Sequence, residues 1–252
     1  MYIEFAGLPA SGKTTLSSAL NKHLKLLQRY CLYRNEAIIQ CIKKRDDGRI
    51  KNMVKLLPSR IWLPFMGERY ILPEFVTFSS RHLELIALIS KALAGSNLPK
   101  LLIESIWNTI VRTFSEVHLI SQYLDDSDLV IMDEAFSQRC FTLFAYMEST
   151  VSDELITRYA KLAPISNHLF WVVTDPKICV ERFMQRLQIR PLPFGFQTNS
   201  KELLEEFESG HNVLKRLSTA LEDQGKSVYR ISGDKDMHDS ISQVCKAYSV
   251  PN

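Results

Sequence analysis

The sequence has few of the features that mark secreted or membrane-spanning proteins. Its five cysteines are odd in number and show no C-x-x-C spacing (Cys31, Cys41, Cys140, Cys179, Cys245). This pattern favours a reduced protein over a disulfide framework and speaks against a zinc site. No signal peptide precedes the first predicted strand, and no apolar run reaches the roughly 18–20 residues that span a bilayer. We therefore expect a cytoplasmic protein without a membrane partner.

The sequence also has little net charge. Its 31 Lys and Arg residues against 28 Asp and Glu give a formal charge of +3, and the basic residues are scattered. The cluster at 43–51 is interpreted as solvated surface, although it could touch phosphate. Since a nucleic-acid-binding domain needs a concentrated basic patch, we expect no nucleic-acid partner. There is no internal repeat and no low-complexity tract, and 252 residues suit one α/β domain with insertions.

One complete motif occupies residues 7–14. Gly7-Leu8-Pro9-Ala10-Ser11-Gly12-Lys13-Thr14 matches the phosphate-binding pattern G-x-x-x-x-G-K-[ST] at every fixed position. An extended run, 2–6, precedes it, and apolar residues at helical spacing predict a helix over 13–27. A strand, a glycine loop and a helix form the context that confirms such a motif. The alternative is a loop before an ordinary helix.

The residue types of the motif suit a polyphosphate. Gly7 and Gly12 allow backbone conformations that turn successive N–H groups towards an anion, and the helix N-terminus adds partial positive charge. Lys13 supplies a full charge for the terminal phosphates, and the Thr14 hydroxyl is the expected Mg²⁺ ligand. We predict that ATP binds to Gly7, Pro9, Ala10, Ser11, Gly12, Lys13, Thr14 and Thr15.

A second chemical signal follows a predicted buried strand at 129–132. Asp133 comes at the end of this apolar run, where a P-loop site needs a carboxylate to hold Mg²⁺ or its water shell. Glu134 follows and is a candidate to position a nucleophile or contact the substrate. Arg139 is a candidate for a polar or anionic substrate group. The alternatives are a helix N-cap with a first-turn acid, and a surface arginine.

Glu36 is a candidate base. It lies just beyond a predicted second strand, 31–34, and the carboxyl ends of parallel strands carry the ligands in open α/β sheets. Glu36 is therefore interpreted as a substrate contact or general base, or else as an exposed loop glutamate. Residues 37–73 are expected to form an insertion of short helices and loops, in which Trp62, Phe65 and Tyr70 line a pocket or pack in the core.

The rest of the chain predicts alternating helices and strands. Long helices are expected at 75–94 and 101–124, although 101–103 could be a strand, and these helices are the candidate surface for a homodimer. A strand at 168–173 precedes Asp175, a candidate N-cap, and Pro176. Arg182, Arg186 and Arg190 then recur every four residues, as on a mobile lid or a solvated basic face. A helix at 201–222, a strand at 228–231 and a helix at 238–248 follow.

In this order of motifs the chain resembles the P-loop kinases of nucleosides and nucleotides, the deoxynucleoside kinase and thymidylate kinase group. The resemblance rests on residues 7–15, on Glu36, on 133–139 with Phe144-Ala145, and on 173–176 with Glu181 and the three lid arginines. Residues 37–128 align with nothing specific. Where deoxynucleoside kinases carry acid-arginine-serine, this chain has Asp133-Glu134-Ala135, which is similar to the acidic pair of more distant P-loop kinases acting on sugars or antibiotics.

The resemblance implies a three-layer α/β/α P-loop NTPase fold with a five-stranded parallel sheet in the order 2-3-1-4-5 and a helical lid. It implies one domain over 1–252, with a helical insertion at about 37–74 and a lid at about 182–200. It also implies MgATP as phosphoryl donor, held in part by Arg182, with Arg186 and Arg190 as catalytic lid arginines and Glu36 as the base.

These expectations converge on a kinase that phosphorylates a small acceptor, a nucleoside, nucleotide or sugar-like metabolite. In this interpretation Lys13 holds the donor phosphates, Thr14 and Asp133 hold Mg²⁺, and Glu36 or Glu134 takes the acceptor's proton. The alternative is an ATP-hydrolysing switch in which Glu134 orients water. Against it, the sequence has no N-K-x-D or L-S-G-G-Q motif and no second ATPase domain. A third interpretation is a pseudoenzyme that binds ATP without turnover.

Overall fold

The computed structural model describes residues 2–45, 71–125, 128–189 and 199–249. Its helices and strands alternate along most of the chain. In order they are β1 (Tyr2–Gly7), α1 (Lys13–Leu26), β2 (Cys31–Tyr33), α2 (Arg34–Arg45), α5 (Leu83–Ala94), α6 (Lys100–Tyr123), β3 (Leu129–Met132), α7 (Phe136–Phe144), the 3₁₀ helix η1 (Ala145–Thr150), α8 (Asp153–Leu162), β4 (His168–Val173), α9 (Pro176–Ile189), α10 (Ser200–Glu222), β5 (Ser227–Ser232) and α11 (Met237–Ser249). Residues 71–81 are also helical.

The five strands form one parallel sheet in the order β2-β3-β1-β4-β5. This confirms the fold class and strand order that the sequence predicts. Because β1 is central and pairs with β3 on one side and β4 on the other, the loops that follow these three strands emerge at the same edge of the sheet. The glycine motif follows β1, and Asp133-Glu134 follows β3.

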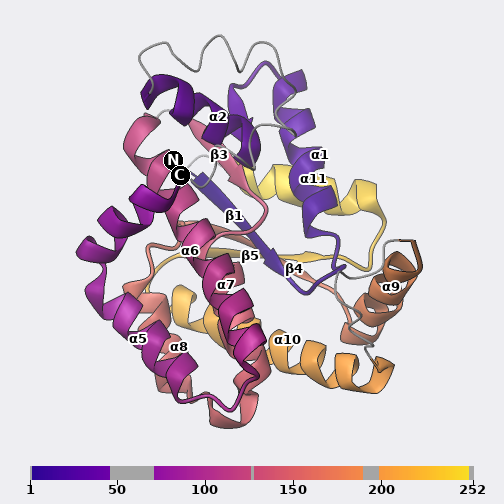
Figure 1. The fold of residues 1–252 in the computed structure, drawn as a ribbon. Helices are drawn as coiled ribbons and strands as arrows, with labels where there is room; N and C mark the ends of the chain where they lie inside the picture. The colour runs from indigo at the N-terminus through magenta and orange to yellow at the C-terminus, as the bar shows by residue number, and fades with distance from the viewer. Residues whose placement is uncertain (1, 46–70, 126–127, 190–198, 250–252) are drawn as a thin grey trace.

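Helices cover both faces of the sheet (Figure 1). One face packs against α1 and α11, where Ile3, Phe5 and Ile131 meet Leu16 and Leu20. The other face packs against a larger group of helices that includes α2, α6, α7 and α10. The alternation along β1 explains this division, because successive side chains of a strand point to opposite faces. Glu4 therefore points towards the α7 side, away from Ile3 and Phe5.

An aromatic cluster holds the larger layer together. Phe78, Phe114 and Phe136 come from the helix at 71–81, from α6 and from α7, and their ring centroids lie 4.6–5.8 Å apart. All three side chains are fully or almost fully buried. Since α7 begins directly after the Asp133-Glu134 pair, this cluster fixes the start of the helix that supports the acidic end of β3.

The structure departs from the predicted elements at His82 and at helix α8, and it confirms two other expectations. The helix expected at 75–94 is interrupted at His82, which has φ −126° and ψ 43°. The helix expected at 101–124 is confirmed as α6, Lys100–Tyr123, and because it includes residues 101–103, the alternative of a strand there is wrong. Helix α8, which the apolar spacing did not suggest, begins after Ser152, whose hydroxyl accepts a hydrogen bond from the Leu155 amide. The Asp175 cap of α9 is confirmed, since its carboxylate accepts from the Lys177 amide at 2.8 Å.

Two expected regions fall largely outside the described residues. Helix α2 accounts for the insertion as far as residue 45 and residues 71–74 are helical, whereas 46–70, with Trp62, Phe65 and Tyr70, lie outside. The expected lid is described up to residue 189.

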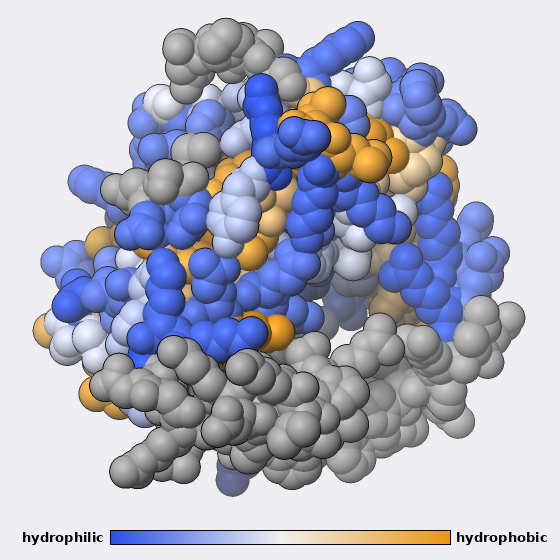
Figure 2. Space-filling view, turned by 90° about the horizontal axis from the view of Figure 1, so that it is seen from above, coloured by the Kyte–Doolittle hydropathy of each residue, from blue (hydrophilic) through white to orange (hydrophobic). Residues whose placement is uncertain are grey.

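In the described parts of the chain, no helix combines the length and the hydropathy needed to cross a bilayer. Hydrophilic side chains predominate on the face seen in Figure 2.

Truncating the centre of the aromatic cluster should destabilise the fold. We expect Phe114→Ala to lower the free energy of unfolding by about 3–5 kcal/mol, because a fully buried ring leaves a cavity between helices that cannot close around it. Leu83→Ala, at a side chain that is 68% exposed, should cost less than about 1 kcal/mol. Urea denaturation of both variants measures the difference, and equal losses would show that the cluster does not stabilise this layer.

Candidate active site

The loop after β1 has the geometry of an anion cradle. Ala10 and Gly12 have positive φ values of 62° and 97°, and the Ser11 amide donates to the Leu8 carbonyl at 3.1 Å. Gly12 is the N-cap of α1 and supplies no side-chain cap, so the first amides of this helix have no side-chain cap among the described residues. Free amides at a helix N-terminus, together with its dipole, favour a phosphate group.

Neighbouring elements hold this loop in place. The Gly7 amide donates to Oε1 of Gln138 on α7 at 3.1 Å, and the Thr174 hydroxyl after β4 donates to the Ser11 carbonyl at 3.0 Å. A Cβ atom at Gly7 would lie 2.6 Å from the Ser11 hydroxyl oxygen, so the first glycine of the motif is needed for close packing. The cradle is therefore held in its conformation by Thr174, which follows β4, and by Gln138 in α7.

Lys13 is buried beneath the cradle, with 7% of its surface exposed. Its Nζ donates to the Leu8 carbonyl at 3.3 Å and lies 3.7 Å from Oε1 of Glu134. Burial lowers the pKa of Lys13, and the charges of Glu134 and Asp133 oppose this shift. The structure thus brings the motif lysine next to the acidic pair, as the strand order predicts.

Asp133 has an oxygen that suits a hard cation. Its Oδ1 is buried and has no hydrogen-bond partner among the described residues, and Nη1 of Arg34 lies 4.0 Å from it. A buried carboxylate oxygen without a hydrogen bond fits Mg²⁺, which takes one or two carboxylates and fills its other positions with phosphate oxygens and water. The described residues contain no cluster of three or more His, Cys, Asp or Glu side chains that could hold a metal on their own.

Glu134 and Arg139 form a second ion pair beside Lys13. Nη2 of Arg139 donates to Oε2 of Glu134, and the arginine is 4% exposed. Burial alone would raise the pKa of Glu134, but the charges of Lys13 and Arg139 lower it below its usual range. Glu134 is therefore an ionised carboxylate at neutral pH, and Lys13 and Arg139 fix its orientation.

The structure adds three residues to this site that the sequence analysis did not assign to it. Glu116 on α6 is 1% exposed, and its carboxylate accepts from Arg34 at the start of α2 and from Nε of Arg112 at 3.0 Å. Two features of the sequence could have drawn attention to Arg112 and Glu116. Arg112 and Glu116 are spaced i, i+4, and Glu116 is an acid beside the apolar positions Phe114 and Val117.

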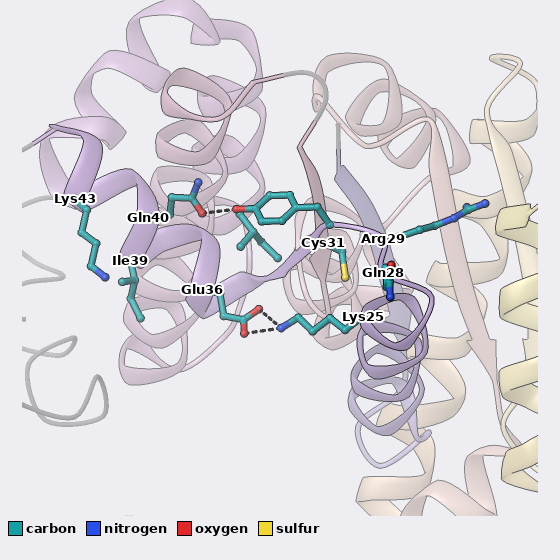
Figure 3. Close-up of a pocket in the computed structure, with 10 residues that line it drawn as sticks. Lys25, Gln28, Arg29, Cys31, Glu36, Ile39, Gln40 and Lys43 are labelled. Atoms are coloured by element: carbon teal, nitrogen blue, oxygen red, sulfur yellow. Dashed lines mark hydrogen bonds and ion pairs between the residues drawn. The ribbon is translucent and has the colours of Figure 1, made fainter. Parts of the chain in front are cut away.

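Glu36 lies apart from this cluster. Its carboxylate accepts from Nζ of Lys25 at 2.7 and 2.9 Å and from the Tyr33 amide at 2.8 Å, in a different hollow near the end of α1 (Figure 3). The physical reason is that the chain turns into α2 directly after β2, so that Arg34 instead of Glu36 faces the acidic pair. The role of Glu36 as base remains a prediction, and no described contact brings its carboxylate to the cradle.

The other predicted residues that the structure describes belong to α1 and α9. Thr14 and Thr15 are exposed in the first turn of α1. On α9, Nη1 of Arg182 donates to the Gly233 carbonyl after β5 at 3.2 Å, and Arg186 is exposed. Arg190 lies outside the described residues. The lid role of these arginines remains a prediction.

A polar hollow adjoins the acidic pair. It has a volume of about 780 Å³ and lies between the start of α2, one face of α6 and the Glu134–Arg139 pair. Its described lining is Arg34, Asn35, Leu101, Glu104, Ser105, Asn108, Thr109, Arg112, Thr113, Glu134 and Arg139. The hollow is large enough for a small organic molecule placed next to Glu134.

Comparison with known proteins gives structural likeness only. No protein-family model and no curated protein matches the chain. Solved structures of a deoxyadenosine kinase from M. mycoides are similar over the full length of both chains: the form with bound dCTP at 12% identity and a TM-score of 0.47, and the form with dCMP and dCDP at 10% and 0.46. The form with bound dATP covers 98% of this chain and 99% of its own at 11% and 0.40.

Beneath the site, Glu4 is a fully buried carboxyl group in the centre of the sheet. It accepts hydrogen bonds from the Ser137 amide at the start of α7, and its Oε2 has no partner among the described residues. Burial raises its pKa to about 7, against the effect of the amides of Ser137 and Gln138. Because Gln138 also accepts from Gly7, Glu4 supports the helix that steadies the cradle.

The raised pKa of Glu4 predicts a pH-dependent stability. Between its unfolded value near 4.5 and its folded value near 7, the native state binds the extra proton, so stability falls as the pH rises through this window. We expect the free energy of unfolding to drop by about 2–3 kcal/mol more in the wild type than in Glu4→Gln between pH 5 and 8. Urea titrations at both pH values measure this, with Glu208→Gln, at an exposed site, as the control. Parallel profiles for wild type and Glu4→Gln would contradict the assignment.

Proposed function

We propose that this protein is an ATP-dependent kinase that transfers the γ-phosphoryl group of MgATP to a hydroxyl or phosphate of a small acceptor. One observation carries the proposal: Lys13 from the cradle lies 3.7 Å from Glu134 after β3, and Glu134 lines a hollow of acceptor size. A donor in the cradle and an acceptor in the hollow would meet at this acidic pair. Phosphoryl transfer requires chiefly such positioning and charge neutralisation.

Each residue has a role that follows from its surroundings. The loop amides and Lys13 bind the donor phosphates, and Lys13 exchanges part of its contact with Glu134 for the γ-phosphate. Thr14 and Asp133 would hold Mg²⁺, which when bound neutralises charge on the β- and γ-phosphates. Arg182 and Arg186 come from α9, the helix after β4, and with Arg190 they would belong to a closing lid that excludes water from the transfer.

For the base we propose Glu134 in place of Glu36. The Glu134 carboxylate lines the hollow and is ionised, whereas the Glu36 carboxylate is bound to Lys25 in another hollow. A general base must come within hydrogen-bond reach of the proton that it removes. Arg139 would keep Glu134 aimed at the acceptor while Lys13 turns to the donor.

Removing the lysine should abolish donor binding in the cradle. We expect Lys13→Ala to lower kcat/KM for ATP by about 10²–10³-fold, because it deletes a buried cation that contacts the transferring group. Isothermal titration with MgATP should also lose most of its heat. Lys22→Ala, on the same helix, is the control. Unchanged binding and turnover in Lys13→Ala would refute the proposal.

A pair of glutamine variants separates the two candidate bases. Glu134→Gln should lower kcat about 10²–10⁴-fold with little change in ATP binding, since it removes the proton acceptor and keeps the shape. Glu36→Gln should stay within about twofold of the wild type. Transfer of label from γ-labelled ATP to an organic acceptor is the readout. A large loss in Glu36→Gln alone would restore Glu36 as the base, and acceptor-independent release of phosphate would favour the ATP-hydrolysing switch.

A further inference from the structure

The hollow beside Glu134 is lined by one face of helix α6. Five polar side chains recur along it at intervals of three and four residues, which places them on a single stripe: Glu104, Ser105, Asn108, Thr109 and Arg112. The apolar residues between them, such as Ile106 and Ile110, are buried in the core on the opposite side. The stripe is therefore the hydrophilic face of an amphipathic helix that closes one side of the hollow.

The stripe continues below the surface, unlike an ordinary solvated helix face. Thr113 and Glu116 follow Thr109 and Arg112 by four residues and are 2% and 1% exposed. Glu116 holds Arg34 and Arg112 together, so two guanidinium groups are fixed on the wall by a buried carboxylate. Such a fixed arrangement keeps the remaining N–H donors in place and lowers the entropy lost on binding.

The lining offers hydrogen bonds and few apolar surfaces. Ten of the eleven described lining residues are polar or charged, Leu101 is the exception, and none of them is aromatic. Pockets for flat, partly apolar ligands such as nucleobases use aromatic and aliphatic faces for stacking. Amides, hydroxyls and guanidinium groups at short intervals instead match a ligand with many hydroxyl groups.

Charge around the hollow is balanced. Its three arginines, Arg34, Arg112 and Arg139, face three carboxylates, counting Glu104 and Glu134 in the lining and Glu116 behind it. Glu104 is additionally 3.8 Å from Lys100. Because no strong excess of either sign remains, recognition here depends on hydrogen bonds, and an acceptor without net charge fits the site.

We propose that this hollow binds a polyhydroxylated acceptor without a nucleobase, namely a sugar or polyol, and the proposal rests on the kinase function above. The acceptor oxygen forms a bond to the γ-phosphorus, and the bond from this phosphorus to the β–γ bridging oxygen breaks. ADP leaves with the electron pair, and the hydroxyl proton passes to Glu134. Asn108 and Arg112 are the specificity-determining residues that bind the other hydroxyl groups.

A panel of acceptors tests the substrate class. The full chain is mixed with γ-labelled MgATP and with D-glucose, D-ribose, inositol or glycerol, and in parallel with the common nucleosides and nucleoside monophosphates. Label on one of the sugars or polyols is the expected result. Label only on nucleosides or nucleotides overturns this inference and leaves the kinase function standing. Label on no compound, with ATP hydrolysed at the same rate in every mixture, overturns both.

A matched pair of variants tests the place of binding. Asn108→Leu should raise the KM of the best sugar or polyol about tenfold, because an amide facing the hollow loses its hydrogen bonds, and should leave the KM of ATP unchanged. Gln122→Leu makes the same change at an exposed position of α6 outside the hollow and should leave both values unchanged. Circular dichroism checks that both variants are folded. Equal KM values for the acceptor in the two variants would overturn the assignment of this hollow.

Discussion

The parallel pairing of β1 with both β3 and β4 is the constraint on which the candidate site depends. It brings the loop of Lys13 to the same edge of the sheet as the Asp133-Glu134 pair and Thr174, although both follow Lys13 by more than a hundred residues in sequence. Each strand is held by apolar side chains on both faces, so the edge keeps its shape without a ligand. The close approach of Lys13 and Glu134 is a consequence of this register.

The site is supported from below by polar groups buried in the sheet and helices. Glu4 in β1 and Gln138 in α7 connect the start of α7 to the first glycine of the cradle. Placing polar groups in a core has a cost that is offset only where they are hydrogen-bonded, so their presence under the cradle indicates that positioning was favoured over maximal stability. A single helix thus couples the cradle to the acidic end of β3, because α7 also carries Arg139.

The sequence was sufficient for the sheet and for the cradle, since both depend on local patterns. Short apolar runs ended by an acid or a glycine marked β1, β3 and β4, and the strand order followed from the resemblance. The place of Glu36 was harder to predict, because it depends on where β2 ends: the chain enters α2 at Arg34, and the Glu36 carboxylate binds Lys25. Glu116 was not assigned because its partner Arg34 lies 82 residues away in sequence, and such pairs become visible only in three dimensions.

The cationic side of the site comes from segments that are distant from β3 in sequence or follow it in α7. Glu134 follows Asp133 directly, so two acids stand next to each other after β3. In the structure Arg34, at the start of α2, lies beside Asp133, and Arg139 binds Glu134 from the first turns of α7. Arginines from two other segments therefore lie beside the acidic pair, and the charge of Arg139, together with that of Lys13, lowers the pKa of Glu134. Glu134 is thus a carboxylate whose position is fixed by Arg139 next to Lys13 of the loop after β1.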